Sequence, residues 1–132
     1  MDALVIGAGP AGLMAAETMA ARGLRVVVAE GKPSIGRKFL MAGKSGLNIT
    51  KAQELGAFVS AYRAPWLEPA LRAFGPDQVV DWCRGLGQEV FTGTTGRVFP
   101  RSMKGSPLLR AWLNRLGAAG VELRLRWRWI SW

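Results

Sequence analysis

Residues 4–12 read LVIGAGPAG, an apolar run that leads into three glycines, Gly7, Gly9 and Gly12, with the spacing GxGxxG. A second apolar run at 26–29 ends in the acidic residue Glu30. In dinucleotide-binding folds the first of these glycines permits a tight turn after a strand. The second lets the backbone approach a pyrophosphate, and the third lets the next helix pack closely on the sheet. The two stretches therefore predict the strand–helix–strand start of a dinucleotide-binding domain.

The expected ligand contacts follow from this arrangement. A pyrophosphate would lie against the N-terminus of a helix that begins near Ala11, where N–H groups and the positive end of the helix dipole point outward. Glu30 would accept hydrogen bonds from a ribose diol, and its charge would repel a 2′-phosphate. A glycine-rich turn without a ligand is the alternative. We disfavour it because an apolar strand, a helix and an acid all stand at the expected spacing.

Composition limits the chemistry that the chain can perform. Of its 132 residues 49% are hydrophobic and 20% charged, which suits one globular core. The formal net charge is +9 and there is no histidine, so imidazole takes no part in catalysis or zinc binding and we expect no metal site. The single cysteine, Cys83, excludes an intrachain disulfide, and its spacing from Val79, Trp82 and Leu86 predicts a buried thiol.

The apolar N-terminus does not have the pattern of a targeting segment. Asp2 stands where a signal peptide carries basic residues, and Glu17 interrupts the apolar run. No stretch reaches the roughly 20 apolar residues of a membrane span. We therefore expect a cytoplasmic protein that does not engage a membrane.

Apolar periodicity predicts the elements around this start. We expect strands at 3–6 and 24–30 and, between them, a helix at 11–22 that Gly23 ends. This helix would carry Ala11, Met14, Ala15, Thr18 and Met19 along one face.

A long insertion is predicted after the second strand, at about 50–105. Helical patterns occur at 66–74 and at 76–85, where Pro76 suits a first helical position. Strand patterns at 88–91 and 97–99 flank the turn 92–96, which predicts a β-hairpin.

After the insertion the pattern returns to helix and strand. Ser106 is predicted to be an N-cap with Pro107 as the first helical residue, and Gly117 and Gly120 would end this helix. Its expected core stripe is Leu109, Trp112, Leu113 and Leu116. The stretch from Val121 to about Ile130 is predicted to be the third parallel strand.

Basic residues are concentrated in two places. The stretch 31–51 carries five cations and no acid, namely Lys32, Arg37, Lys38, Lys44 and Lys51. It could neutralise a diphosphate or be a solvated loop, and its place directly after Glu30 favours the cofactor. At 123–129 arginines alternate with leucines and tryptophans. Such interleaving can bind nucleic acid, but any half-buried strand shows the same alternation, and we favour the strand.

Two motifs carry a family resemblance. Residues 36–50, GRKFLMAGKSGLNIT, and 96–104, GRVFPRSMK, resemble the bacterial FAD-dependent family often labelled aminoacetone oxidase-like, which includes a bile-acid dehydro-intermediate reductase. The resemblance extends over essentially the whole chain and about the N-terminal third of a typical member. Residues 42–48, AGKSGLN, lack the arginine and cysteine of the more widespread SGGGRCN form. The substrates of better-known members therefore do not carry over.

The resemblance implies FAD as the cofactor, with its adenine end held by the strand–helix–strand unit. It implies that a flavin-side cavity is lined by Arg37, Lys38, Gly43, Ser45 and Asn48, and that the backbone of Trp129 meets the adenine. Together with the fingerprint, the predicted cofactor-binding residues are Gly7, Gly9, Pro10, Ala11, Gly12, Glu30, Gly31, Arg37, Lys38, Gly43, Ser45, Asn48 and Trp129. The sequence identifies no catalytic acid or base.

The sequence thus predicts an α/β fold: the N-terminal portion of a Rossmann-like FAD/NAD(P)-binding domain with a parallel sheet and a helical and β-hairpin insertion. The expected function is two-electron flavin oxidoreduction of a small organic substrate, with NAD(P)H as electron donor. An NAD-dependent dehydrogenase domain is the nearer alternative, and a basic nucleic-acid-binding module the more distant one. As an incomplete domain, the chain alone is expected to be inactive.

Overall fold

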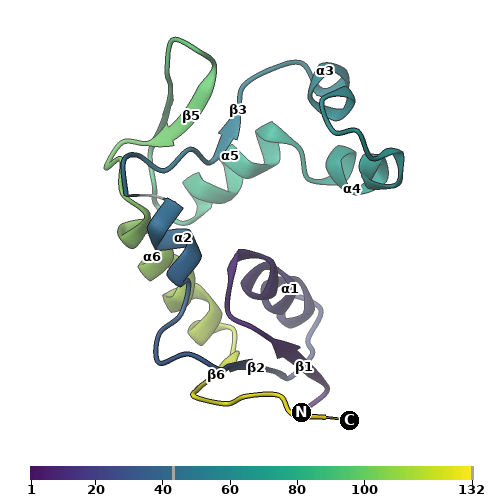
Figure 1. Cartoon of the computed structure of the whole chain (residues 1–132), viewed down its shortest axis with the longest axis vertical. Helices are drawn as coiled ribbons and strands as arrows, with labels where there is room; N and C mark the ends of the chain where they lie inside the picture. Colours follow the sequence, from purple (N-terminus) through teal and green to yellow (C-terminus); the bar gives the residue numbers. More distant parts are fainter. Residues whose placement is uncertain (43, 132) are drawn as a thin grey trace. The chain divides into compact units, whose positions relative to one another are not determined.

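The computed structural model describes residues 1–42 and 44–131 (Figure 1). The chain divides into two compact units, and we describe each by itself. The first unit comprises residues 1–41 together with the chain from Leu109 onward, and the second comprises residues 42–108. The second unit therefore begins earlier in the sequence than the insertion predicted at about 50–105.

A three-stranded parallel sheet forms the centre of the first unit, with the order β1-β2-β6. Its strands are β1 (Ala3–Ile6), β2 (Val26–Glu30) and β6 (Glu122–Leu125). Val28 in the middle strand lies opposite Val5 on one side and Leu123 on the other. This confirms the predicted α/β class, the parallel sheet and the first strand.

Helix α1 (Pro10–Ala20) connects β1 to β2 and packs on them. The predicted face does not form the core contact: the buried residues are Leu13 and Ala16, whereas Ala11, Ala15 and Thr18 are exposed. The reason lies at Gly12, where a Cβ would lie 1.9 Å from the carbonyl oxygen of Gly7. The helix touches the strand end at Gly12, and that contact turns the side of the helix that carries Leu13 and Ala16 toward the sheet.

Helix α6 (Gly105–Ala118) begins at residue 105, so Ser106 lies within its first turn and is not the predicted N-cap. Before it, the N–H of Met103 donates to Pro100 at 2.8 Å and Met103 has a φ of 59°, a turn that leads the chain into the helix earlier than expected. The predicted stripe is largely confirmed: Leu109, Trp112 and Leu116 are buried and Leu113 is half-buried. In the first unit, the Phe39 ring on α2 (Arg37–Ala42) packs against the Trp112 ring in a T-shaped arrangement.

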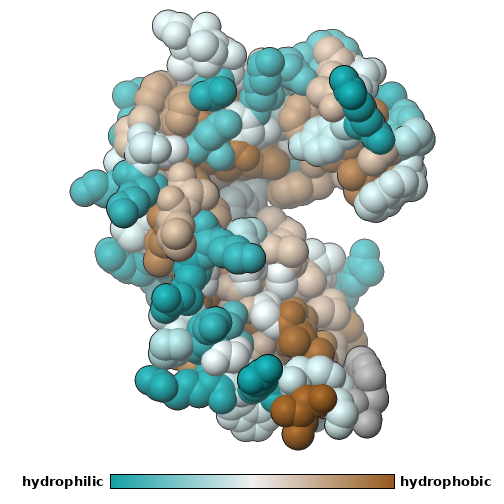
Figure 2. Space-filling model, viewed as in Figure 1, coloured by the Kyte–Doolittle hydropathy of each residue, from teal (hydrophilic) through white to brown (hydrophobic). Residues whose placement is uncertain are grey.

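Strand β6 is shorter than predicted, since it ends at Leu125 rather than near Ile130. Arg126 adopts a left-handed φ of 60°, which interrupts the strand and its alternation of faces. Beyond it, the N–H groups of Arg126 and Trp127 donate to the carbonyls of Lys32 and Glu30, at 3.2 and 3.0 Å. The predicted apolar strand face is therefore lost, and Trp127 is 51% exposed; hydrophobic surface lies over this end of the first unit in Figure 2.

The second unit combines short helices with a small antiparallel sheet of order β3-β5-β4. Its strands are β3 (Thr50–Lys51), β4 (Val90–Thr92) and β5 (Arg97–Pro100). Its helices are α3 (Leu55–Ser60), the 3₁₀ turn η1 (Pro65–Leu67), α4 (Glu68–Ala73) and α5 (Pro76–Gly85). The β4–β5 hairpin and α5 confirm the predictions. The helix predicted at 66–74 is divided into η1 and α4, and α2, α3 and β3 were not predicted.

Cys83 is fully buried in the second unit, as its place on the apolar stripe predicted. Val98 of β5, Leu86 and Leu108 are also buried there. Within the described part of the chain, no helix has the length and apolar character needed to cross a membrane.

Candidate functional site

A groove of about 450 Å³ lies in the first unit where the β1–α1 turn, the end of β2 and α2 meet. It brings together five of the predicted cofactor-binding residues: Gly9, Pro10, Glu30, Arg37 and Lys38. Its other lining residues are Ala8, Lys32, Ser34, Gly36 and Met41.

The glycine loop presents its backbone to this groove. Gly7 has a φ of 97°, a conformation that favours glycine, as its predicted turn requires. Gly9 is the N-cap residue of α1, and a Cβ placed on it would meet nothing within 4 Å. Among the described residues no side chain caps this helix, and its first turn carries no acidic residue. Since the first N–H groups of a helix have no acceptor within it, an anion could take this place.

Glu30 links the two sides of the groove. One carboxylate oxygen accepts a hydrogen bond from the N–H of Ala8 and the other from the N–H of Lys32, both at 2.8 Å. The carboxylate thereby holds the glycine loop against the segment that follows β2. Each oxygen has a second lone pair, so the carboxylate can still accept from a ligand hydroxyl.

Three cations line the groove together with this single carboxylate, namely Lys32, Arg37 and Lys38. The Arg37 guanidinium donates to the Ser34 hydroxyl at 3.1 Å. Gly36, with a φ of 64°, donates its N–H to the carbonyl of Ala8 at 3.0 Å and so ties the basic segment to the glycine loop. The excess of positive charge over Glu30 suits a polyanionic ligand.

Three further predicted residues lie beside the groove rather than in its lining. Ala11 is exposed in the first turn of α1, and Gly12 packs against Gly7. Gly31 is exposed directly after β2, where a Cβ would lie 3.9 Å from the carbonyl oxygen of Trp127.

Trp129 lies in a different hollow of the first unit, of about 220 Å³, together with Val27, Ala29 and Trp127. There the Arg124 guanidinium stands 4.3 Å from the centre of the Trp127 ring, a cation–π contact. A hydrogen bond to Glu122 raises the pKa of Arg124 above its usual value. The structure therefore does not bring Trp129 into the groove with Gly9 and Glu30.

Two of the remaining predicted residues, Ser45 and Asn48, belong to the second unit and are exposed there. Gly43 lies outside the described residues. Their contact with a flavin stays a prediction.

Sequence reasoning left some groove residues out of the predicted site. Lys32 was noted only as part of the basic stretch, although its place two residues after Glu30 could have identified it. Ser34 and Met41 line the groove without any signal in the sequence. Over the described ranges, no group of three or more histidine, cysteine, aspartate or glutamate side chains is arranged to hold a metal ion.

A glycine loop, an uncapped helix N-terminus and an acid at the end of the second parallel strand define a Rossmann-like domain. The family model of the HI0933-like protein Rossmann domain matches residues 1–132, and the chain belongs to this family. A search of curated proteins gave no match to this chain.

Solved structures share the fold at low sequence identity. Thermovibrio ammonificans THI4 is 20% identical with a TM-score of 0.60, over 94% of this chain and 38% of its own. A flavocytochrome c3 fumarate reductase is 20% identical with a TM-score of 0.58, over 95% of this chain and 26% of its own. A 3-ketosteroid-Δ4-(5α)-dehydrogenase from Rhodococcus jostii RHA1 is 16% identical with a TM-score of 0.53, over 95% and 37%. The chain thus spans less than half the length of these proteins.

Proposed function

We propose that this chain binds FAD as part of a flavin-dependent oxidoreductase, with the ADP half of the cofactor in the groove of the first unit. The observation that carries the proposal is the pairing, in one groove, of the open Gly9 backbone at the start of α1 with the Glu30 carboxylate. Two solved structures of similar fold are a flavocytochrome c3 fumarate reductase and a 3-ketosteroid dehydrogenase, and their names support a function in oxidoreduction.

The groove residues fit the chemistry of this ligand. The pyrophosphate would accept hydrogen bonds from the first N–H groups of α1, near Ala11 and Gly12, where Gly9 leaves room for it. Lys32, Arg37 and Lys38 would neutralise its charge. Glu30 would accept from the ribose hydroxyls while it keeps its bonds to Ala8 and Lys32.

When bound, the isoalloxazine ring of FAD supplies two-electron transfer, and the protein supplies binding and orientation. The proposal includes a small organic substrate and NAD(P)H as the electron donor. It also includes the finer assignment to the aminoacetone oxidase-like flavoproteins, which the motifs at 36–50 and 96–104 support.

Gly9→Val provides the direct test. A branched side chain at this position fills the space through which the pyrophosphate reaches the helix, so FAD affinity should fall at least about tenfold, or roughly 1.4 kcal/mol. Flavin fluorescence titration of the full chain measures this. Gly117→Val is the matched control, because a Cβ at Gly117 on α6 also meets nothing within 4 Å.

Two results would contradict the proposal. One is full flavin occupancy of Gly9→Val, which would make the glycine spacing an ordinary turn. The other is tighter binding of NAD⁺ than of FAD by the unsubstituted chain, which would favour a dehydrogenase domain.

A further inference from the structure

A second cavity, of about 540 Å³, lies wholly within the second unit, between α5 and the antiparallel sheet. It is formed by side chains, including Arg84 and Val80 of α5 and Val90 and Thr92 of β4. Its volume falls within the range of roughly 300 to 1,000 Å³ in which proteins bind small molecules.

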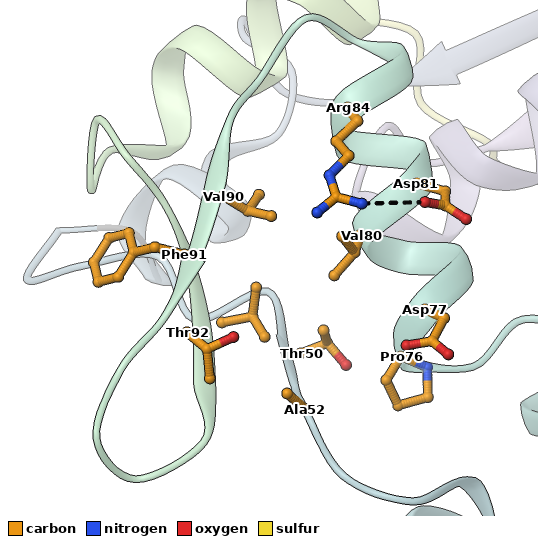
Figure 3. A pocket seen from close by; sticks show the side chains of 11 residues that line it. Thr50, Ala52, Pro76, Asp77, Val80, Asp81, Arg84, Val90, Phe91 and Thr92 are labelled. Carbon is orange, nitrogen blue, oxygen red and sulfur yellow. Dashed lines mark ion pairs between the residues drawn. The ribbon is translucent and has the colours of Figure 1, made fainter.

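Figure 3 shows which groups point into this space. The Arg84 guanidinium and Val80 extend from α5 toward the strands, whereas Asp77 and Asp81 lie on the other flank of the helix in this view. The side chains of Thr50 and Thr92 lie on the strand side. The lining thus contains one arginine, two carboxylates, two hydroxyls and apolar surface, and Arg84 is the charged group that extends toward the strands in this view.

Most hydrogen-bond donors of the Arg84 guanidinium are available to a ligand. Its only ion pair among the described residues is with Asp81, at 3.6 Å, and both side chains are mostly exposed. A guanidinium has five N–H donors in a planar fork, and this long contact engages one of its nitrogens. A carboxylate in the cavity could accept two parallel hydrogen bonds from the fork, which is the strongest geometry that arginine offers.

We propose that this cavity binds a small organic carboxylate with an apolar body. Arg84 would donate to the carboxylate, and the hydroxyls of Thr50 and Thr92 would donate to it or to a second oxygen of the ligand. Val80, Val90 and Val98 would cover the apolar part. This site goes beyond FAD binding, because it uses no residue of the groove in the first unit.

The probe is 4-phenylbutyrate, compared with its uncharged alcohol, 4-phenylbutanol, and its cation, 4-phenylbutylamine. Each is titrated into the full chain without added flavin and followed by backbone amide NMR. We expect saturable shifts at Thr50, Val90 and Thr92 for the carboxylate, and weaker binding of the alcohol and the amine.

Arg84→Gln should lower the affinity for 4-phenylbutyrate at least about tenfold, the effect of one charge-assisted hydrogen bond. Asp81→Asn should raise this affinity several-fold, because the substitution releases the Arg84 guanidinium from its ion pair. Arg101→Gln is the matched control, since Arg101 pairs with Glu89 at 3.0 Å and does not line this cavity. Dispersed NMR spectra of each variant would show that it folds.

Four outcomes would overturn the proposal. The amine could bind more tightly than the carboxylate, which would make Asp77 and Asp81 a cation site. The shifts could cluster at Gly9 and Glu30, which would place the carboxylate in the groove of the first unit. Arg84→Gln and Arg101→Gln could weaken binding equally, or no saturable shift could occur at millimolar concentrations. None of these results depends on whether the chain binds FAD.

Discussion

The groove of the first unit and the cavity of the second unit are lined by different kinds of chemical group. The groove of the first unit combines backbone groups with side chains. The backbone part comprises a glycine loop, the N-terminus of α1 and N–H groups that Glu30 holds in place, and the side chains come mainly from Glu30 and the basic segment after β2. The cavity of the second unit is formed by side chains of α5 and of three short strands. The backbone part of a binding site needs particular glycines at particular spacings, so a sequence motif predicts it. A site made of side chains needs only compatible residues from distant positions.

The units also differ in how tightly their elements approach one another. At Gly12 the helix backbone lies so close to the end of β1 that even a Cβ would overlap the Gly7 carbonyl. In the second unit, β3 has two residues, and the described helices of the unit other than α5 have six or fewer. We therefore expect the first unit to respond most strongly to added volume at the glycine loop, and the second to respond to loss of single polar contacts.

Gly12→Ala should give the largest effect on stability. The added methyl group would lie 1.9 Å from a backbone oxygen, so the helix must move away from the sheet, at a cost of about 3 kcal/mol. Urea unfolding followed by amide hydrogen exchange would show the loss in the first unit. Gly117→Ala, where a Cβ meets nothing within 4 Å, should instead stabilise α6 by roughly 0.5–1 kcal/mol. Equal effects of the two substitutions would mean that the close contact at Gly12 does not exist.

Glu30→Ala should give the next largest effect, on the affinity for FAD. It tests whether the groove of the first unit depends on this carboxylate. We expect FAD affinity to fall by about 1.5 to 3 kcal/mol, the value of a charge-assisted hydrogen bond. Without flavin, the amides of Ala8 and Lys32 should exchange faster, since each donates to Glu30. Calorimetry and hydrogen exchange measure the two effects separately. An unchanged FAD dissociation constant would exclude the ribose assignment, even if the loop loosened.

The same contrast explains what could be predicted from the sequence. Gly7 has a positive φ and Gly12 a close backbone contact, which few other residues could meet, and the structure places both, with Gly9 and Glu30, around the predicted turn at the ends of β1 and β2. The parallel sheet and the β4–β5 hairpin followed from apolar runs and turn residues.

The failures arose where tertiary contacts override local pattern. The buried face of α1 is fixed by the contact at Gly12, which the glycine spacing predicts but the apolar periodicity along the helix does not. β6 ends at Leu125 because Arg126 adopts a left-handed φ, although the alternation of residue types continues to Trp129. β3 has only two residues, and its pairing with β5 is all that defines it.

Glu54→Gln should give the smallest effect, confined to the second unit. Both oxygens of Glu54 accept hydrogen bonds at the start of α3, from the N–H groups of Gly56 at 2.7 Å and Ala57 at 2.9 Å. These bonds, that from Gly56 first, lower the pKa of Glu54 below its usual value. Because its pKa is lowered, the ionised carboxylate stabilises the fold at pH values above its pKa in the unfolded chain, which is near 4.5. This stabilisation is lost as the pH falls through the lower pKa of the folded chain.

The substitution should therefore speed amide exchange in α3 and its contact helix α4 at neutral pH, and the difference from the unsubstituted chain should shrink below about pH 4. Asp2→Asn is the control in the first unit, because Asp2 accepts from the Arg25 backbone and guanidinium and its pKa is likewise lowered, mainly by the Arg25 side chain. We expect that change to speed exchange around β1 and β2 alone. If either substitution speeds exchange in both units equally, the chain opens as one cooperative body. The contrast between a unit sensitive to packing and a unit sensitive to polar contacts would then be wrong, because a weakness at either place would be shared by the whole chain.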